Sequence, residues 1–425
     1  MNTLSVVIPA YNEEGGIAQI IERVLAIRPG LAEAGVDDME LIVVDDGSHD
    51  ETAAIASRYS QVRLIRHPGN RGYGAALKTG FSQARGNLLG FLDADGTYPP
   101  ENFSDLCHVA LTEEADLVVG SRMSGAESEM PAVRRLGNFI FANLVSLLGN
   151  HHVSDSSSGM RVIRREALAR LYPLPDGLNF TPVMSTRALH EDIRWKEVPI
   201  PYQERVGRSK LSVVHDGTRF LYTIIWTALN YNPVRILGGI GLALAAIAGV
   251  IVAAIAGMRL SGVTRLGPWG VVGVFGASLC AVSGVTLFSL GATFNYLVSL
   301  FHGRPVRQGL LGKPVFKRPL ERHFGWMGLL AIVVGLAVGA GSLGLSLGGW
   351  PIERLWLYLL GAAMLLVLGL QLAVFWVIMH VLYELSQREA QVALDLNPER
   401  QVKRSHPERQ VQGVSLSPKE APCES

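Results

Sequence analysis

The chain has 425 residues, of which 48% are hydrophobic and 18% are charged, and its formal net charge is +1 at pH 7. Without a strong overall charge, the sequence does not favour a nucleic-acid partner. The three cysteines, Cys107, Cys280 and Cys423, lie far apart in the sequence and predict neither a metal site nor a disulfide framework.

The first 120 residues or so alternate between strand-like and helix-like segments, as βαβ units do. The expected strands are residues 4–9, 40–44, 62–66, 88–92 and 115–119, and the expected helices between them are residues 16–26, 50–59 and 74–84. This order predicts an α/β domain with a mostly parallel, doubly wound sheet. Ligands of such sheets bind in the crevice outside the carboxyl ends of the strands.

Polar residues close the first two expected strands. They are Pro9-Ala10-Tyr11-Asn12-Glu13-Glu14 after the first strand and Asp45-Asp46-Gly47-Ser48 after the second. Neighbouring strand ends share one crevice, where an acidic side chain can hold the ribose hydroxyls or the base of a nucleotide. The alternative is that Ser48 or Asp50 begins the next helix as an N-cap.

Asp93-Ala94-Asp95 follows the apolar run 88–92, which is typical of a buried strand. Two carboxylates in the crevice suit Mg²⁺ or Mn²⁺ held against a pyrophosphate, because bare carboxylates would repel a diphosphate. A solvated turn is the alternative for so short a motif. The glycine-rich segment Gly69-Asn70-Arg71-Gly72-Tyr73-Gly74 favours a turn, with a phosphate-binding loop as the alternative, and its spacing does not fit a Rossmann fingerprint.

Four apolar runs, at residues 236–258, 269–301, 326–347 and 355–381, are each long enough to cross about 30 Å of hydrocarbon. They predict four transmembrane helices. The first residues have no signal-peptide pattern. The segment between the second and third runs carries Arg304, Arg307, Lys313, Lys317, Arg318 and Arg322. The positive-inside rule therefore places this loop, the first domain and the C-terminal end in the cytosol.

Residues 208–234 combine Trp and Tyr with a few charges and predict juxtamembrane interfacial helices, with a last helix of the soluble domain as the alternative. Residues 384–425 hold too little apolar surface to fold alone. The predicted organisation is a cytosolic domain at 1–207, the juxtamembrane segment at 208–234, a four-helix transmembrane domain at 235–383 and a disordered cytosolic tail at 384–425.

Several motifs occur in order: Val6-Val7-Ile8-Pro9-Ala10-Tyr11-Asn12-Glu13, Val44-Asp45-Asp46-Gly47-Ser48, Asn70-Arg71-Gly72-Tyr73-Gly74, Asp93-Ala94-Asp95-Gly96 and Gly120-Ser121-Arg122. Together they resemble the family-2 glycosyltransferases of GT-A fold. Two further segments, Ser158-Gly159-Met160-Arg161 and the run from Tyr202 to Leu211, resemble the polyprenyl-phosphate hexosyltransferases, the group of dolichyl-phosphate mannose and glucose synthases. The resemblance covers about residues 3–230.

The resemblance implies a metal-dependent, inverting transfer of a hexose from a UDP- or GDP-sugar to undecaprenyl or dolichyl phosphate at the cytosolic membrane face. The residues matching the donor site are Pro9, Tyr11, Glu13, Asp45, Asp46, Asp93 and Asp95, and Asp93 and Asp95 would hold Mg²⁺ or Mn²⁺. Those matching the acceptor-phosphate site are Arg122, one of Arg134 and Arg135, Arg205, Ser209 and Lys210. Asp95, Arg122, Arg205 and Lys210 are expected to act in the transfer itself. The expected partners are the nucleotide sugar, the lipid phosphate and the membrane, with a homo-oligomer left open.

One position departs from the family pattern. Mannosyl members often have Leu-Gln after the Asp-Ala-Asp, and the Gln helps to hold the metal, whereas this chain has Gly96-Thr97. The difference favours a glucosyl-like or other donor. On the acceptor side, a lipid monophosphate with a second pKa near ~6 is mostly a dianion at neutral pH and is already a nucleophile. Positioning and charge neutralisation should therefore dominate the chemistry.

Two other functions stay open. A processive polysaccharide synthase of the same fold would carry Gln-x-x-Arg-Trp, but Glu191 precedes Arg194-Trp195 where the Gln should be. The second alternative is a lipid-linked-sugar flippase or binding module with a regulatory glycosyltransferase-like domain. The intact Asp93 and Asp95 pair argues against this, as do the few ionisable groups in the apolar runs.

Overall fold

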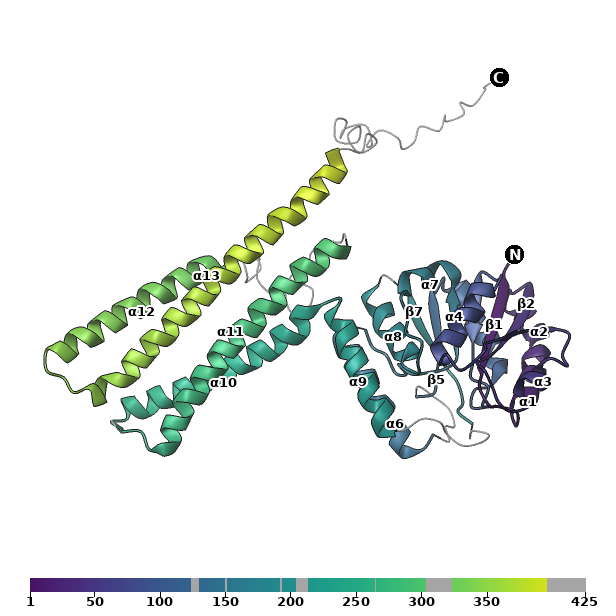
Figure 1. The fold of residues 1–425 in the computed structure, drawn as a ribbon, viewed down its shortest axis with the longest axis horizontal. Coiled ribbons are helices and arrows are strands. Elements are labelled where there is room, and N and C mark those ends of the chain that lie inside the picture. Colours follow the sequence, from purple (N-terminus) through teal and green to yellow (C-terminus); the bar gives the residue numbers. More distant parts are fainter. Residues whose placement is uncertain are drawn as a thin grey trace, which may run out of the picture. The chain divides into compact units, whose positions relative to one another are not determined.

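The computed structural model describes residues 1–123, 130–149, 151–191, 193–203, 213–263, 265–302 and 323–395. The chain divides into two compact units, Met1–Tyr231 and Asn232–Ser425 (Figure 1). The first unit contains the sheet, and the second contains long apolar helices. Arg205, Ser209 and Lys210 lie outside the described residues, as do the six basic residues between the second and third apolar runs.

The first unit is built on a seven-stranded sheet with the order β3-β2-β1-β4-β6-β5-β7. The strands are β1 (Thr3–Ala10), β2 (Asp38–Asp45), β3 (Val62–Arg66), β4 (Leu88–Phe91), β5 (Leu117–Ser121), β6 (Arg161–Arg164) and β7 (Trp195–Pro199). All pairings are parallel except those of β6, which runs antiparallel to β4 and β5. The predicted mostly parallel sheet is confirmed. The sequence analysis missed β6, because a strand of four residues with an arginine at each end has no clear apolar pattern.

Helices of the first unit cover both faces of this sheet or, like the sixth and ninth, pack beside the eighth. They are α1 (Ile17–Ala26), α2 (Arg28–Glu33), α3 (Thr52–Ala56), α4 (Tyr73–Gln83), α5 (Phe103–Thr112), α6 (Ala132–Gly149), α7 (Arg165–Leu171), α8 (Phe180–His190) and α9 (Val213–Leu229), with a 3₁₀ turn at Pro100–Asn102. Successive residues of β1 point to opposite faces, so Val6 packs in one core with α1 and α5 while Val7 packs in the other with α4 and α8. Burial on both faces explains the unbroken apolar run of β1.

Helices α6 and α9 each have one buried face and one exposed apolar face. Phe141 of α6 packs edge-on against Phe220 of α9, with ring centroids 6.0 Å apart. The opposite faces expose Leu136, Phe139, Ile140 and Leu147 on α6, and Leu221, Tyr222 and Trp226 on α9. Helix α9 thus belongs to the first unit, beyond the boundary expected at residue 207, and yet presents an aromatic surface to the outside.

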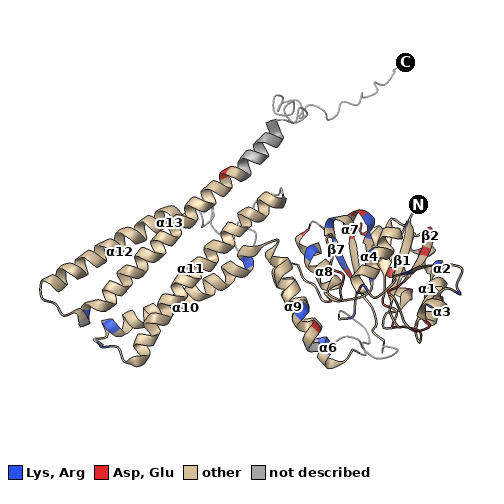
Figure 2. Ribbon diagram, in the orientation of Figure 1, with Lys and Arg blue, Asp and Glu red and all other residues tan. Residues whose placement is uncertain are grey.

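The second unit consists of a π-helical turn (Val234–Gly238), α10 (Gly239–Leu260), α11 (Pro268–His302), α12 (Phe324–Leu347) and α13 (Ile352–Asp395). Among the described residues, four helical segments are long and apolar enough to cross a membrane, as predicted. Figure 2 shows few charged residues on them. Helix α13 continues to Asp395, so the beginning of the segment expected to be disordered is helical. Good helix formers extend a helix that has already nucleated.

Helices α10 and α11 form one packed pair and α12 and α13 another, while α11 and α13 join the two pairs. Gly241 and Gly284 lie where α10 and α11 approach closely, because small residues let two helix backbones come near each other. Between the pairs, Gln371 Nε2 donates a hydrogen bond of 2.8 Å to Thr286 Oγ1.

Candidate active site

A cavity of about 710 Å³ lies at the carboxyl ends of β1, β2, β4 and β5 and is closed by residues of α6, α8 and α9. Of the residues predicted from the sequence, those that line it are Pro9, Tyr11, Glu13, Asp46, Asp93, Asp95, Arg122 and Arg134. Asp45 and Arg135 are not among its lining residues. Arg205, Ser209 and Lys210 cannot be placed, since they fall outside the described residues.

The loops that follow β1 and β2 are joined by hydrogen bonds. The amide of Asn12 donates to Ser48 Oγ at 2.9 Å, and its side-chain Oδ1 accepts from the His49 amide at 2.9 Å. The Glu13 amide donates to Thr52 Oγ1 at 2.8 Å. Asp50 accepts from the Thr52 amide at 3.0 Å, but the N-cap of α3 is Glu51, so neither Ser48 nor Asp50 begins the helix as its N-cap. These contacts fix the two strand ends as one edge of the cavity.

Both carboxylate oxygens of Asp46 accept hydrogen bonds from backbone amides. They accept the amides of Arg71 at 2.9 Å and Gly72 at 2.8 Å, and Oδ1 also lies 2.7 Å from His67 Nδ1. The glycine-rich loop is therefore a turn organised around a buried carboxylate. Asp45 is likewise engaged, because it accepts the Ser48 amide at 3.1 Å and lies 3.6 Å from Arg66 Nε.

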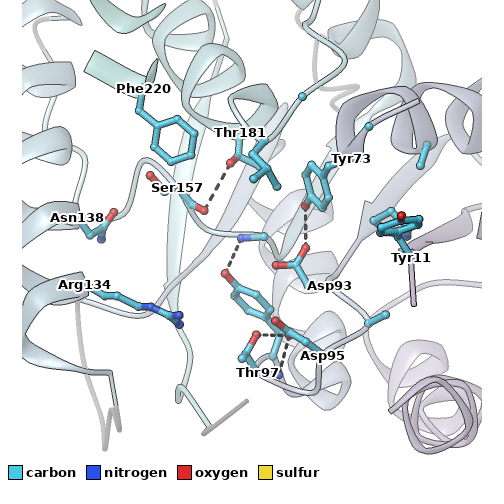
Figure 3. A pocket seen from close by; sticks show the side chains of 18 of the residues that line it. Tyr11, Tyr73, Asp93, Asp95, Thr97, Arg134, Asn138, Ser157, Thr181 and Phe220 are labelled. Atoms are coloured by element: carbon cyan, nitrogen blue, oxygen red, sulfur yellow. Dashed lines mark hydrogen bonds between the residues drawn. The ribbon is translucent and has the colours of Figure 1, made fainter. Parts of the chain in front are cut away.

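Asp93 and Asp95 each have a hydroxyl partner. Tyr73 Oη donates to Asp93 Oδ1 at 2.8 Å, and Thr97 Oγ1 donates to Asp95 Oδ1 at 2.6 Å (Figure 3). Burial and the nearby Asp93 raise the pKa of Tyr73, so its hydroxyl stays protonated and remains a donor. Thr97 stands at the position that departs from the mannosyl pattern, and its hydroxyl holds the Asp95 carboxylate in place.

The backbone of Gly159 packs directly against the Asp93 carboxylate. A Cβ at this position would lie 2.4 Å from Asp93 Oδ2 and 2.8 Å from its Cγ. The Gly159 amide donates a hydrogen bond of 2.7 Å to Tyr98 Oη, which fixes the backbone there. The absence of a side chain at residue 159 thus gives Asp93 its place in the cavity.

Arg122 enters the cavity already paired with Asp155, a residue that the sequence analysis did not select. Its Nε and Nη2 donate to the two oxygens of Asp155 at 2.7 and 2.9 Å. Burial works to raise the pKa of Asp155, but the Arg122 guanidinium and its hydrogen bonds outweigh burial and hold this pKa below its usual value. The guanidinium lies over the rings of Tyr98 and Tyr202, with Cζ to centroid distances of 5.6 and 5.9 Å.

Arg161 supports the segment that carries Asp155 and Gly159. Its side chain is fully buried, and it donates to the carbonyls of Ser158 and Ser156, each at 3.0 Å. Burial lowers the pKa of Arg161 to about 10. The motif residues Ser158 to Arg161 thus shape the cavity through the backbone.

Helices α6 and α9 supply the other side of the cavity. Arg134 Nη1 donates to Tyr202 Oη at 3.3 Å, whereas Arg135 is exposed, so the structure favours Arg134 for the cavity. Asn138, one helical turn after Arg134, is 6% exposed and lines the cavity, and neither of its amide atoms has a hydrogen-bond partner among the described residues. Figure 3 shows Asp93 and Asp95 between Tyr11 on one side and Arg134 and Asn138 on the other.

Apolar side chains complete this second side of the cavity: Met130, Val133, Phe141, Leu178 and Phe220. Sequence reasoning missed the cavity residues Tyr73, Asn138 and Arg219 as well as Asp155. The spacing of four residues between Arg134 and Asn138 was the available signal for Asn138, because such residues share a helix face. Asp155 had no such signal, since its partner Arg122 is distant in the sequence.

A mostly parallel α/β sheet with an Asp-x-Asp pair at the end of β4 and arginines in the same cavity defines a glycosyltransferase of GT-A type. The description "Glycosyl transferase family 2" matches residues 5–172, and "Domain of unknown function (DUF8752)" matches residues 233–393. The chain belongs to glycosyl transferase family 2, and the predicted family is confirmed.

Three known proteins illustrate the similarity. The chain is 34% identical over 235 residues to the low-salt glycan biosynthesis hexosyltransferase Agl6 of Haloferax volcanii, covering 54% of each chain. It is 30% identical over 316 residues to the undecaprenyl-phosphate 4-deoxy-4-formamido-L-arabinose transferase of Photorhabdus laumondii, covering 73% of this chain and 87% of that one. Glucosyl-3-phosphoglycerate synthase from Mycobacterium tuberculosis, crystallised with Mn²⁺, UDP and phosphoglyceric acid, is 25% identical with a TM-score of 0.45, covering 53% and 78%. The chain thus spans about half the length of Agl6.

Proposed function

We propose that the protein transfers a hexose from a nucleotide sugar to a polyprenyl phosphate at the membrane surface. The observation that carries this proposal is the composition of one cavity. Its first side holds the carboxylates of Asp93 and Asp95, and its second side holds Arg134 and an apolar wall from α6 and α9. A donor diphosphate and a lipid phosphate need these two kinds of surroundings. The names of relatives that act on undecaprenyl phosphate and dolichyl phosphate support the same acceptor class.

The donor belongs beside the strand-end loops, with its nucleotide near Tyr11 and Glu13 and its diphosphate near Asp93 and Asp95. Two carboxylates fit Mg²⁺ or Mn²⁺ that completes its coordination with water and phosphate oxygens. Within the described residues, no cluster of three or more His, Cys, Asp or Glu offers a metal cage. A bound ion would neutralise charge on the departing nucleoside diphosphate. Tyr73 and Thr97 orient the two carboxylates for that task.

The acceptor phosphate belongs beside Arg134 and Asn138. An oxygen of the dianion attacks the anomeric carbon of the sugar, and the bond from that carbon to the donor diphosphate breaks. A single displacement inverts the anomeric configuration, and the attacking oxygen carries no proton that a base must remove. These side chains contribute by holding the attacking phosphate oxygen in line with the bond that breaks between the anomeric carbon and the diphosphate. Arg205, Ser209 and Lys210 remain proposed contacts of the same phosphate.

The exposed apolar faces of α6 and α9 are proposed to rest on the bilayer that the helices of the second unit cross. Large exposed apolar surfaces mark interaction sites, and Trp and Tyr favour the headgroup layer. This contact would keep the cavity at the height of a lipid phosphate. The positive-inside rule, applied to the basic segment between the second and third apolar runs, supports a cytosolic position for the first unit and the C-terminal end.

The test is a transfer assay with the purified full chain, a panel of UDP- and GDP-sugars, and undecaprenyl or dolichyl phosphate, read by mass spectrometry of the lipid. One hexose per lipid phosphate is the expected product, and excess chelator should abolish its formation. Asp95→Asn should also nearly abolish transfer, because it removes a charged ligand from a site worth several kcal/mol. Donor hydrolysis without a lipid product, or several sugars on one lipid, would contradict the proposal.

A further inference from the structure

We infer that Arg219 of α9 is a further arginine that binds the phosphate of the lipid acceptor. The inference rests on the proposed function, because it identifies a further contact for the same acceptor. Arg219 lies in the juxtamembrane helix, outside the motifs that the resemblance covers most closely. Arg219 and its sequence neighbour Phe220 both line the cavity, and Phe220 belongs to the apolar wall.

The guanidinium of Arg219 lies against the backbone at Gly177. A Cβ at Gly177 would be 2.5 Å from Nη2 of Arg219 and 3.1 Å from its Cζ. Both Gly177 and Arg219 line the cavity. Arg219 is exposed as a residue, so part of its side chain meets solvent, while its guanidinium lies over Gly177, which has no side chain to displace it.

The charge of the acceptor favours a further cation in the cavity. A phosphate monoester carries a charge of about −1.5 to −2 at pH 7. The charge of Arg122 is already matched by Asp155, while Arg134 bonds to a phenol oxygen. Among the described residues, neither Arg134 nor Arg219 lies within ion-pair distance of a carboxylate. The two arginines therefore bring two unmatched positive charges from two helices to one cavity, which suits a dianion.

The surroundings of Arg219 favour a phosphate that carries a hydrocarbon chain. Phe220 lines the cavity and packs against Phe141 of α6, with ring centroids 6.0 Å apart. Consecutive residues of α9 thus present a cation and an aromatic ring to the same cavity. A phosphate bound at Arg219 has an apolar surface beside it for the first prenyl unit.

The experiment compares Arg219→Gln and Arg219→Lys in the full chain, with lipid phosphate varied at saturating nucleotide sugar. Arg219→Gln should lower kcat/KM for lipid phosphate about 10- to 150-fold, the range for losing a hydrogen-bonded charge partner. The KM for the nucleotide sugar should stay within about twofold, because the donor binds on the other side of the cavity. Arg219→Lys should recover part of the loss, since it restores the charge without the planar fork.

Arg135→Gln is the matched control, because Arg135 is an exposed arginine of α6 that does not line the cavity. It should leave both parameters unchanged. Gly177→Ala provides a second route, since its methyl group displaces the Arg219 guanidinium without removing it, and it should raise the KM for lipid phosphate alone. If wild-type protein transfers sugar to lipid and Arg219→Gln matches it, the inference about Arg219 is wrong. If wild-type protein makes no lipid product from any donor in the panel, the proposed function itself fails.

Discussion

Asp155 binds Arg122 through both carboxylate oxygens, at 2.7 and 2.9 Å, and also accepts the Arg122 backbone amide at 3.2 Å. Asp155 is wholly buried, and 13% of the Arg122 side chain is exposed. The pair fixes the guanidinium and matches its charge before any substrate binds. In the proposed transfer, Arg122 would therefore serve the acceptor as an oriented donor of hydrogen bonds more than as a free positive charge.

Replacing Asp155 with Asn should destabilise the first unit by about 3–5 kcal/mol, because it leaves a buried charge unpaired. Thermal and denaturant unfolding of the full chain in detergent would measure this. The pKa of Asp155 lies below its usual value in the folded state. The stabilisation is therefore complete above about pH 4 and is lost as pH falls through the lowered pKa, so the difference from wild type should shrink there.

Glu101→Gln is the control for this change. Arg23 binds Glu101 in the same two-pronged way, at 3.1 and 2.8 Å, but the pair is exposed. Its loss should cost less than about 1 kcal/mol. Equal effects of the two variants would show that burial does not set the strength of the Arg122–Asp155 pair.

Gly159→Ala should lower the rate of transfer about 100-fold, because its methyl group would displace the Asp93 carboxylate and misplace the donor. The measurement is kcat at saturating substrates, together with the affinity for Mn²⁺. Gly69→Ala is the matched control, since a Cβ there meets nothing within 4 Å. A Gly159→Ala protein with wild-type kcat would contradict the placement of Asp93 against residue 159.

Tyr73→Phe removes the hydroxyl that holds Asp93 and should weaken the activity about tenfold or more, as expected for a hydrogen bond to a charged group. Tyr59→Phe offers a close comparison, because Tyr59 Oη also donates to a carboxylate at 2.8 Å, that of Glu22, on the exposed surface. Steady-state kinetics at several metal concentrations would separate the two. The Tyr73 variant should need more metal to reach half of its maximal rate, and the Tyr59 variant should not.

The rate of transfer should depend on pH through the acceptor. Below pH ~6 the lipid phosphate gains a proton, and both its nucleophilicity and its charge fall. The rate should then decline about tenfold per pH unit. No decline is expected from Tyr73 up to pH 9, because its pKa is raised above the ordinary value. A pH profile in the full chain that falls between pH 7 and 9 would contradict this assignment of Tyr73.

The exposed face of α6 can be tested with the double change Leu136→Gln and Phe139→Gln. Both side chains are exposed, at 60% and 58%, so the fold should tolerate the change. Activity on a long-chain lipid phosphate in vesicles should fall, because the face no longer enters the bilayer surface. Activity on a short, water-soluble prenyl phosphate should persist. Equal losses on both acceptors would place these residues in the active site instead.

The sequence predicted the features that repeat along the chain or end a strand. The run 62–66 matched β3, because a short apolar strand between turn residues is a local pattern. Asp93 and Asp95 were found for the same reason. The arrangement around them was not predictable. The bond from Tyr73 to Asp93, the pairing of Arg122 with Asp155 and the contact of Arg219 with Gly177 all join residues far apart in sequence. Only the folded arrangement of strands, loops and helices brings them together.

The two faces of helix α6 influence which prenyl phosphates compete for the cavity. The helix turns Arg134 and Asn138 toward the cavity and exposes Leu136, Phe139 and Ile140 on its other side. A helix with its side chains is about 10 Å across. If the exposed side rests on a bilayer, a lipid phosphate has to rise no more than about 10 Å above the bilayer surface to enter the cavity. The isoprene units beyond the first few then stay among the acyl chains. Prenyl phosphates of different length should then compete according to their abundance in that leaflet.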